Sequence, residues 1–291
     1  MKRRKTLGYA MMAPTLLLIL IMQIYPLARG IWYSFENYQI TRPGVNRFVG
    51  LKNYIDLLTT DEKFYRILGF TMVYTIVVCV AAYVIGLALA LLLNRNIPGR
   101  GVIRAFILLP WIISGTVCAT NWRWILNDRY GIINLFLQKI GLISQPLQFL
   151  GDMQLARFTV ILIGIWKFTP FMVVVLLAGL QSVNNDLYEA AKIDGAGFWR
   201  CLFSVTLPSI RSVTTMSTTL LFIWAFNNFE STYLLTGGGP NDATFTLPIY
   251  IYQTSFYRGK ISYGSAVAIS VLLIVLLVSI LRITLQRKED E

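Results

Sequence analysis

Long apolar stretches separated by short polar segments are the dominant pattern of this chain. Each is long enough to cross the roughly 30 Å hydrocarbon core of a bilayer as a helix. The pattern predicts an all-α membrane protein with six transmembrane helices, forming a single domain over residues 1–291. The predicted helices cover approximately residues 7–33, 69–93, 103–125, 157–180, 209–235 and 263–285.

Composition supports an integral membrane protein. The chain has 291 residues, of which 56% are hydrophobic and 14% are charged, whereas a soluble domain is about a quarter charged. The formal net charge is +12. It does not indicate nucleic-acid binding, because the basic residues lie at the ends of the apolar runs and not in a separate basic domain.

The first apolar run follows the basic residues 2–5, a combination also found in signal peptides. This run is too long for a signal peptide, and the sequence at 28–30, Ala-Arg-Gly, is a poor cleavage site. We therefore expect a retained first helix, which Pro14 and Pro26 should bend.

Basic residues are concentrated in alternate connections between the predicted helices. Since cytoplasmic segments of membrane proteins are enriched in Lys and Arg, this bias predicts that both termini lie in the cytoplasm. The segments placed inside are 1–6, 94–104, 181–208 and 286–291.

The inside segment 181–208 has a pattern of its own, two short amphipathic helices at a bend. Asp186 is a candidate N-cap, with Glu189 three residues later, as in a capping box. Gly195 can end the first helix, because glycine tolerates a positive φ. Leu207-Pro208 is expected to open the next helix. The apolar side of the pair is too large to remain in water, so it predicts a partner surface or, alternatively, an ordinary hairpin lying on the membrane.

This segment resembles the EAA motif of the membrane subunits of binding-protein-dependent ABC importers, and EAAKIDGA points to their carbohydrate branch, the maltose/glycerol-3-phosphate type. Val205 stands where isoleucine is commoner. The resemblance implies that the segment is a coupling helix that docks on an ATPase subunit. The residues that would carry this role are Glu189, Ala190, Ala191, Asp194, Gly195, Phe198, Trp199, Leu207 and Pro208.

The same resemblance implies the type I importer permease fold in a bacterial cytoplasmic membrane. A second, related permease subunit would complete the pore, two ATPase subunits would bind ATP and magnesium, and a soluble extracytoplasmic protein would deliver a sugar or oligosaccharide. This chain would then be a transport subunit without cofactor or catalytic residues, working by alternating access. The sequence has no phosphate-binding loop with its lysine, so ATP must be hydrolysed by another polypeptide.

Polar residues inside the predicted spans are candidates for the substrate pathway, because such groups are costly in a membrane. In the fourth helix, Lys167 lies beside Pro170, which is expected to kink the helix. In the fifth helix, Asn227, Glu230 and Tyr233 recur at the spacing of one helix face. The alternatives are a snorkelling lysine and an interfacial belt of aromatic and polar residues. The candidate pathway residues are Trp166, Lys167, Phe171, Trp224, Asn227, Asn228, Glu230 and Tyr233.

Two further segments have weaker patterns. Residues 121–124, Asn-Trp-Arg-Trp, are expected to form an aromatic belt with an anchoring arginine. Ala82, Gly86 and Ala90 put one small residue on every fourth position of the second helix, which predicts close packing on another helix.

Two other classes of protein were weighed against the permease. An ion-coupled secondary transporter could use Lys167 and Glu230 as relays, but no inverted repeat is visible. A membrane-embedded enzyme or a metal site is disfavoured because the chain has no histidine and its three cysteines lack metal-ligand spacing.

Overall fold

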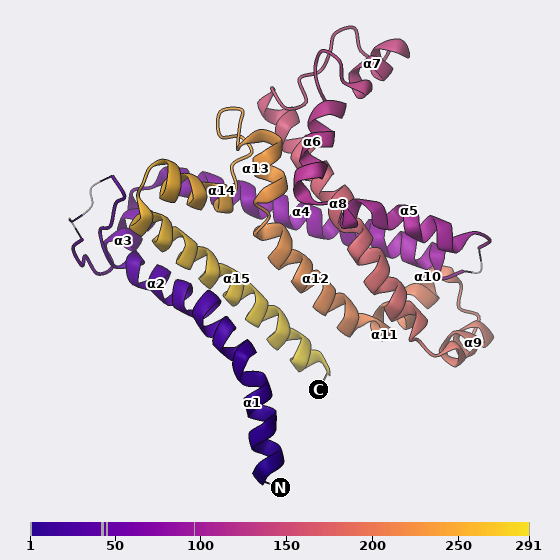
Figure 1. Cartoon of the computed structure of the whole chain (residues 1–291). Coiled ribbons are helices and arrows are strands. Elements are labelled where there is room, and N and C mark those ends of the chain that lie inside the picture. The colour runs from indigo at the N-terminus through magenta and orange to yellow at the C-terminus, as the bar shows by residue number, and fades with distance from the viewer. Residues whose placement is uncertain (1, 42–43, 45, 96, 291) are drawn as a thin grey trace. The chain divides into compact units, whose positions relative to one another are not determined.

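The computed structural model describes the backbone of residues 2–41, 44, 46–95 and 97–290, and the side chains of these residues between Met11 and Thr284. This part of the chain is helical, with one isolated β-bridge between Glu36 and Phe48. The all-α prediction is therefore confirmed (Figure 1). The basic side chains at 2–5 and 287–288, which contributed to the predicted orientation, lie outside the described residues.

The chain divides into two compact units, residues Met1–Tyr65 with Tyr250–Ile274, and residues Arg66–Ile249 with Val275–Glu291. We call them unit 1 and unit 2. The prediction of a single domain over the whole chain is not tested by this division.

Unit 1 begins with the N-terminal span. Helix α1, Lys2–Ile19, passes Pro14 without interruption, and a π-helical turn, Leu20–Ile24, connects it to α2, Tyr25–Ser34. The N–H of Tyr25 bonds to the carbonyl of Leu20, five residues back, immediately before Pro26, which has no N–H to donate. A π-helical turn therefore precedes Pro26, while the bends predicted at Pro14 and Pro26 stay predictions. The remaining helical elements of unit 1 are α3, Lys52–Thr59; the first turn of α4, Glu62–Leu93; the end of α14, Leu247–Tyr252; a π-helical turn, Gln253–Tyr257; and the first part of α15, Ile261–Asp290.

Polar side chains hold unit 1 together at the end where α3 lies. The Asp61 carboxylate accepts hydrogen bonds from the hydroxyls of Tyr250 and Tyr263, the latter at 2.7 Å. The N–H of Tyr38 donates to Ser262 Oγ at 2.8 Å. Burial tends to raise the pKa of Asp61, but the hydrogen bonds to its carboxylate outweigh burial and leave that pKa below its ordinary value.

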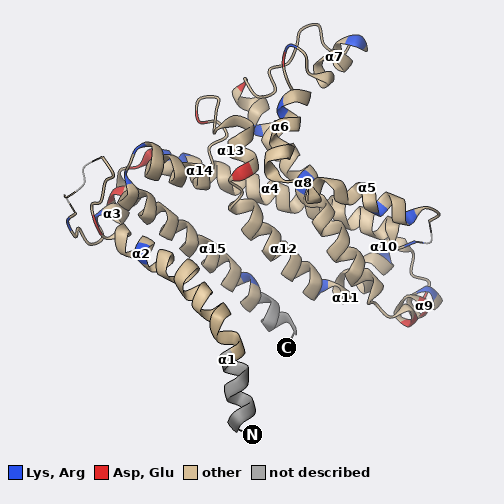
Figure 2. Ribbon diagram, in the orientation of Figure 1, with Lys and Arg blue, Asp and Glu red and all other residues tan. Residues whose placement is uncertain are grey.

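Unit 2 contains the longest buried helices and the insert between two of them. In Figure 2 its charged residues gather toward helix ends and loops, as expected for helices surrounded by lipid. Its helices are α4, Glu62–Leu93; α5, Arg100–Ile112; α6, Gly115–Ile125; α7, Ile132–Lys139; α8, Met153–Gln181; α9, Asn185–Ile193; α10, Phe198–Cys201; α11, Leu207–Ser209; α12, Arg211–Phe226; and α13, Glu230–Thr236.

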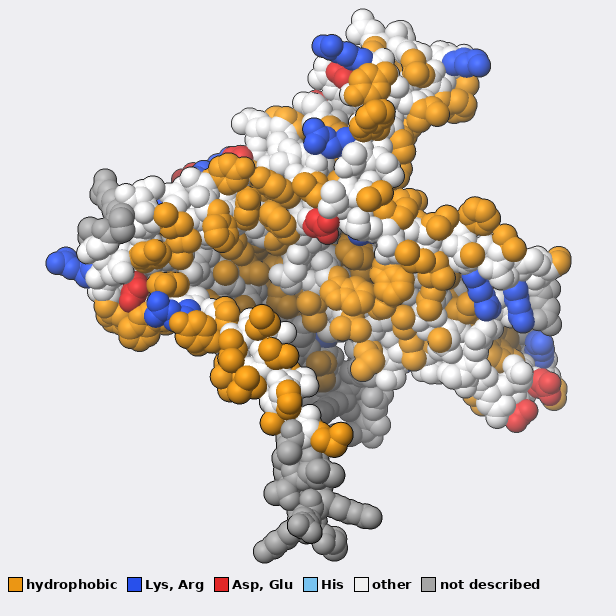
Figure 3. Space-filling view, in the orientation of Figure 1, with side chains coloured by type: hydrophobic (Ala, Val, Ile, Leu, Met, Phe, Trp, Pro, Cys, Tyr) orange, Lys and Arg blue, Asp and Glu red, His pale blue; other side chains and the backbone are white. Residues whose placement is uncertain are grey.

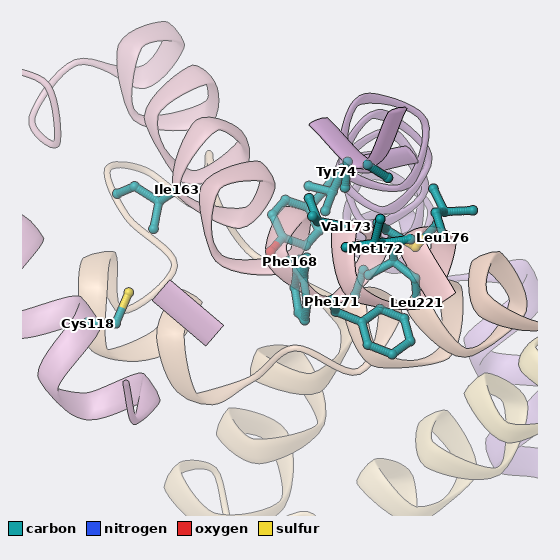
Figure 4. Packing of buried hydrophobic residues seen from close by; sticks show 14 of the residues in the cluster. Tyr74, Cys118, Ile163, Phe168, Phe171, Met172, Val173, Leu176 and Leu221 are labelled. Atoms are coloured by element: carbon teal, nitrogen blue, oxygen red, sulfur yellow. The ribbon is translucent and has the colours of Figure 1, made fainter. Parts of the chain in front are cut away.

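Helices α4 and α8 form the close-packed centre of unit 2. A Cβ built on Gly86 of α4 would lie 2.7 Å from the Cβ of Met172 of α8. Ala82 and Ala90, one turn to either side, are fully buried. Figure 4 shows Met172 and Leu176 of α8 beside Tyr74 of α4. The predicted small-residue face of the second helix is therefore confirmed, and its partner is α8 of the same chain.

Among the residues that the structure describes, four helices are long and apolar enough to cross a membrane, with a fifth span if a bent pair is counted as one. The four are Met11–Ser34, Glu62–Leu93, Met153–Gln181 and Ile261–Thr284. The helix predicted at 103–125 is the bent pair, α5 and α6, which meet at 97°. The helix predicted at 209–235 is divided into α12 and α13 at residues 227–229. A total of six crossings stays a prediction.

Candidate functional site

The break between α5 and α6 is the centre of the candidate site. Ile113 has an extended ψ of 131°, and Ser114 caps α6 by accepting the N–H of Val117 at 3.4 Å. A break of this kind leaves carbonyl groups at the end of the first helix and N–H groups at the start of the second without helical partners. Exposed backbone polar groups at membrane depth are a recurrent feature of transporter binding sites.

Lys167 reaches this break from α8. Its Nζ donates to the carbonyl oxygen of Ile113 at 3.1 Å. The side chain is half-buried, and its charge lies at the C-terminal end of α5, where the helix dipole favours a cation.

Glu230, the first residue of α13, reaches the other side of the same break. Its Oε1 accepts the backbone N–H of Thr116 at 3.0 Å and the hydroxyl of Thr116 at 2.7 Å. The carboxylate therefore lies at the N-terminal end of α6, where the dipole favours an anion. Gly115 makes this approach possible, since a Cβ there would lie 2.6 Å from Glu230 Oε2.

Two charged residues that the sequence singled out separately are thus brought to one break in a third helix. Three participants of this arrangement were not predicted: the carbonyl of Ile113, Gly115 and Thr116. A Ser-Gly pair shortly after Pro110 is the sequence signal that could have marked the break.

Aromatic rings from three helices meet around Phe171 in unit 2. Phe171 lies 4.7 Å from Trp224 and 5.9 Å from Trp111, measured between ring centroids. Trp111 is next to Pro110 and was not predicted as a site residue. Trp166 forms a separate pair, edge to face with Trp122 at 5.4 Å. Trp111 and Trp224 are each about two-fifths exposed, so their rings have free surface on which a sugar ring could stack.

The two predicted asparagines have different surroundings. Asn228 is engaged inside unit 2: its Nδ2 donates to the Tyr74 hydroxyl at 2.8 Å, and its Oδ1 accepts Ser231 Oγ at 2.7 Å. Asn227 is exposed and ends α12, with its Nδ2 bonded to the carbonyl of Ile223 at 2.9 Å. The prediction that Asn227 shares a helix face with Glu230 and Tyr233 is wrong, because the chain leaves the helix between α12 and α13. Tyr233 stacks on Phe229, with 4.9 Å between the ring centroids.

Helix α8 is not interrupted at Pro170. Its assignment is continuous from Met153 to Gln181, and Thr169, next to the proline, donates its hydroxyl to the carbonyl of Ile165 at 2.7 Å. The backbone break lies between α5 and α6, and Lys167 of α8 contacts it.

The N-cap of α9, the first helix of the insert, lies two residues earlier than predicted. Asn184 is the N-cap, and its Oδ1 accepts the N–H of Asp186 at 3.1 Å. Asp186 lies in the first turn, because Asn184 already has the extended backbone that a cap requires. The helix ends as predicted, with Asp194 as C-cap and Gly195 at a φ of +74°.

The second half of the insert is α10 followed by a π-helical turn, Leu202–Thr206. A short turn, α11, begins at Leu207 with Pro208 in it, as predicted, but it continues directly from the π-helical turn. The long helix α12 starts only after Ile210.

The insert exposes large apolar side chains. The exposed fraction is 87% for Ile193, 67% for Trp199 and 62% for Phe203, while Leu202 is buried. Glu189, Ala190 and Asp194 are exposed as well, and Ala191 is half-buried. A surface of this kind has room for a partner. Within the described residues, no group of His, Cys, Asp and Glu could hold a metal ion.

Comparison with known proteins agrees with this architecture. The chain is 37% identical over 277 residues to the trehalose/maltose transport system permease protein MalF of Thermococcus litoralis, covering 95% of this chain and 92% of that protein. It is 33% identical over 291 residues to the diacetylchitobiose uptake system permease protein DasB of Streptomyces coelicolor, covering 97% and 88%.

Among solved structures, a chain of a bacterial ABC transporter involved in the import of the acidic polysaccharide alginate matches with a TM-score of 0.83 and 25% identity. The match covers 99% of this chain and 98% of that chain. The family model for the binding-protein-dependent transport system inner membrane component matches residues 82–289. The chain therefore belongs to this family and is a multi-pass membrane permease of the ABC importer type, a transport component carrying the family's coupling helix.

Proposed function

We propose that this chain is one of two permease subunits of an importer that carries a sugar or short oligosaccharide into the cell at the expense of ATP. The observation that carries the substrate class is the likeness over most of the chain to permeases named for trehalose/maltose and for diacetylchitobiose. Both names describe glycosides, which present hydroxyl groups and apolar ring faces together.

The α5–α6 break and the aromatic rings of unit 2 supply matching chemistry. Lys167, Glu230 and Asn227 offer donors and acceptors for hydroxyl groups, while Trp224 and Trp111 offer exposed ring faces. Phe171 sets the position of both indoles, and Trp166 is held by Trp122. Asn228 and Tyr233 support this region through Tyr74 and Phe229.

Energy enters through the insert. Two ATPase subunits bind ATP and magnesium, and each docks on the insert of one permease subunit. In this chain the docking residues are Glu189, Ala190, Ala191, Asp194, Gly195, Phe198 and Trp199, with Leu207 and Pro208 connecting them to α12. Closure of the ATPase dimer moves the insert as a lever, and the helices on either side open the pathway to one face at a time. An extracytoplasmic binding protein delivers the sugar.

In this arrangement the chain forms one permease domain over residues 1–291, crosses the cytoplasmic membrane six times and keeps both termini in the cytoplasm. The basic connection 94–104 and the insert then lie on the same, cytoplasmic side.

The test is uptake of labelled di- and trisaccharides into proteoliposomes containing the two permeases and the ATPase, with the binding protein supplied outside. We expect uptake that requires ATP inside the vesicles. Glu189→Lys should abolish it and release the ATPase. Asp128→Lys, the same change of charge at an exposed position outside the insert, should do neither. Uptake driven by an ion gradient without ATP would contradict the proposal.

A further inference from the structure

A groove of about 910 Å³ lies in unit 2 between the end of α4 and the insert. Its α4 wall consists of apolar residues spaced by three, one, three and one positions, which places them on one helix face. With a rise of 1.5 Å per residue, the stripe is about 12 Å long. Its members are Val84, Leu87, Ala88, Leu91 and Leu92.

The opposite wall comes from the insert and from the end of α8. Phe198, Trp199 and Leu202 line it, together with Leu180. On the α4 side, Val84 is 57% exposed and Leu92 is 51% exposed, so the groove is open along this helix. An elongated apolar molecule can therefore enter from the side and lie along the stripe.

The rim of the groove is basic. Arg95 lies two residues after Leu93, the last residue of α4, and Lys192 lines the groove from α9. No Asp or Glu is among the described residues that line the groove. Figure 3 shows Lys and Arg side chains at this end of unit 2, with Asp and Glu side chains next to them. Two cations thus stand beside a purely apolar stripe.

We propose that this groove binds one anionic phospholipid, with an acyl chain along the α4 stripe and the phosphate between Arg95 and Lys192. Basic pockets between membrane helices at the cytoplasmic surface bind anionic head groups. A neutral lipid would fill the stripe but would offer no net negative charge to the two cations.

The lipid lies between a membrane helix and the insert. It therefore fills the space behind the coupling helix and links the anionic lipid content of the membrane to the stiffness of the insert. This role is independent of which solute is transported.

The first experiment measures lipid retention by native mass spectrometry of the assembled transporter, with phosphatidylglycerol or phosphatidylcholine added in neutral detergent. The wild-type transporter should retain phosphatidylglycerol in preference to phosphatidylcholine. The double variant Arg95→Gln, Lys192→Gln should retain it on the order of 25-fold less, at about fivefold per cation removed. The control double variant Arg100→Gln, Lys139→Gln removes two exposed charges outside the groove and should match wild type. Equal retention of both lipids by wild type, or equal losses in both variants, would overturn the proposal.

The second experiment locates the lipid. Phosphatidylglycerol with a photoreactive group on its acyl chain should label residues 84–92 and the peptide containing Trp199, and Ala88→Trp should block this labelling by filling the groove. Labelling spread evenly over all lipid-facing helices, or a cross-link from this groove to another protein subunit, would show that the occupant is not a bound phospholipid. Neither result depends on sugar uptake, so failure here is distinct from failure of the transport proposal.

Discussion

Glu230 Oε1 accepts two hydrogen bonds from Thr116, from its backbone N–H at 3.0 Å and from its hydroxyl at 2.7 Å. These two residues are far apart in sequence, and their contact ties the first turn of α13 to the first turn of α6. The carboxylate acts as a cap supplied by another helix, because it satisfies a backbone donor that α6 itself leaves unpaired.

Gly115→Ala should break this contact. The added Cβ would lie 2.6 Å from Glu230 Oε2 and 2.7 Å from its Cδ, so the carboxylate must move away from Thr116. We expect the solubilised chain to lose about 1 kcal/mol of stability, the usual cost of a lost cap. Gly101→Ala is the matched control, because a Cβ there meets nothing within 4 Å. Thermal unfolding measures the stability of both variants. Equal melting temperatures for Gly115→Ala and Gly101→Ala would show that the cap contributes no stability.

Gly86→Ala should separate α4 from α8. The new Cβ would come within 2.7 Å of the Met172 Cβ and within 3.3 Å of backbone atoms of Met172 and Val173, and backbone cannot rotate aside. Overpacking of this kind costs about 1–3 kcal/mol. Gly69→Ala, in the same helix with nothing within 4 Å, should be neutral or slightly stabilising. A melting temperature for Gly86→Ala at or above that of Gly69→Ala would refute the close packing.

Gly195→Val should disable the insert while the rest of the chain folds. Gly195 has a φ of +74°, which costs a residue with a side chain about 1–2 kcal/mol, while open space surrounds it. The bend after α9 should therefore change shape. We expect normal expression with loss of ATP-driven uptake. Gly197→Val is the control, because Gly197 has a φ of −74° and also has open space. Normal ATP-driven uptake by the Gly195→Val variant would show that transport does not require the bend after α9.

Acid should weaken unit 1 through Asp61. The pKa of this carboxyl is lower in the folded chain than the ordinary value of about 3.9, so the charged form contributes stability above that value. This contribution is lost as pH falls below about 4 and through the folded pKa. We expect the melting temperature of wild type to fall over this range more than that of Asp61→Asn, which has no charge to lose. The double variant Tyr250→Phe, Tyr263→Phe should also reduce the difference, since it removes two donors to the carboxylate. Parallel pH profiles for wild type and Asp61→Asn would contradict this role.

Local patterns in the sequence were sufficient for features that depend on near neighbours along the chain. The apolar runs located the long helices α4, α8 and α15, because lipid requires a continuous helix of sufficient length. The spacing of Ala82, Gly86 and Ala90 predicted a packed face, and Gly195 marked the end of α9, since only glycine adopts that φ without strain.

Features that depend on contacts between distant residues were beyond the sequence. The backbone break at the site lies between α5 and α6, whereas α8 is one continuous helix through Pro170, where a kink stays a prediction. Their spacing predicted one helix face for Asn227 and Glu230, but the chain leaves the helix between α12 and α13.

The sequence by itself therefore determined an all-α membrane permease, its coupling insert and the residue types available to a substrate. Only the tertiary structure decided that Lys167 and Glu230 meet at one helix break. The carbonyl of Ile113 and the N–H of Thr116 have no hydrogen-bond partners within their own helices. The packing of α8 and α13 decides which distant side chains bind these two groups, and periodicity along one segment carries no information about that packing.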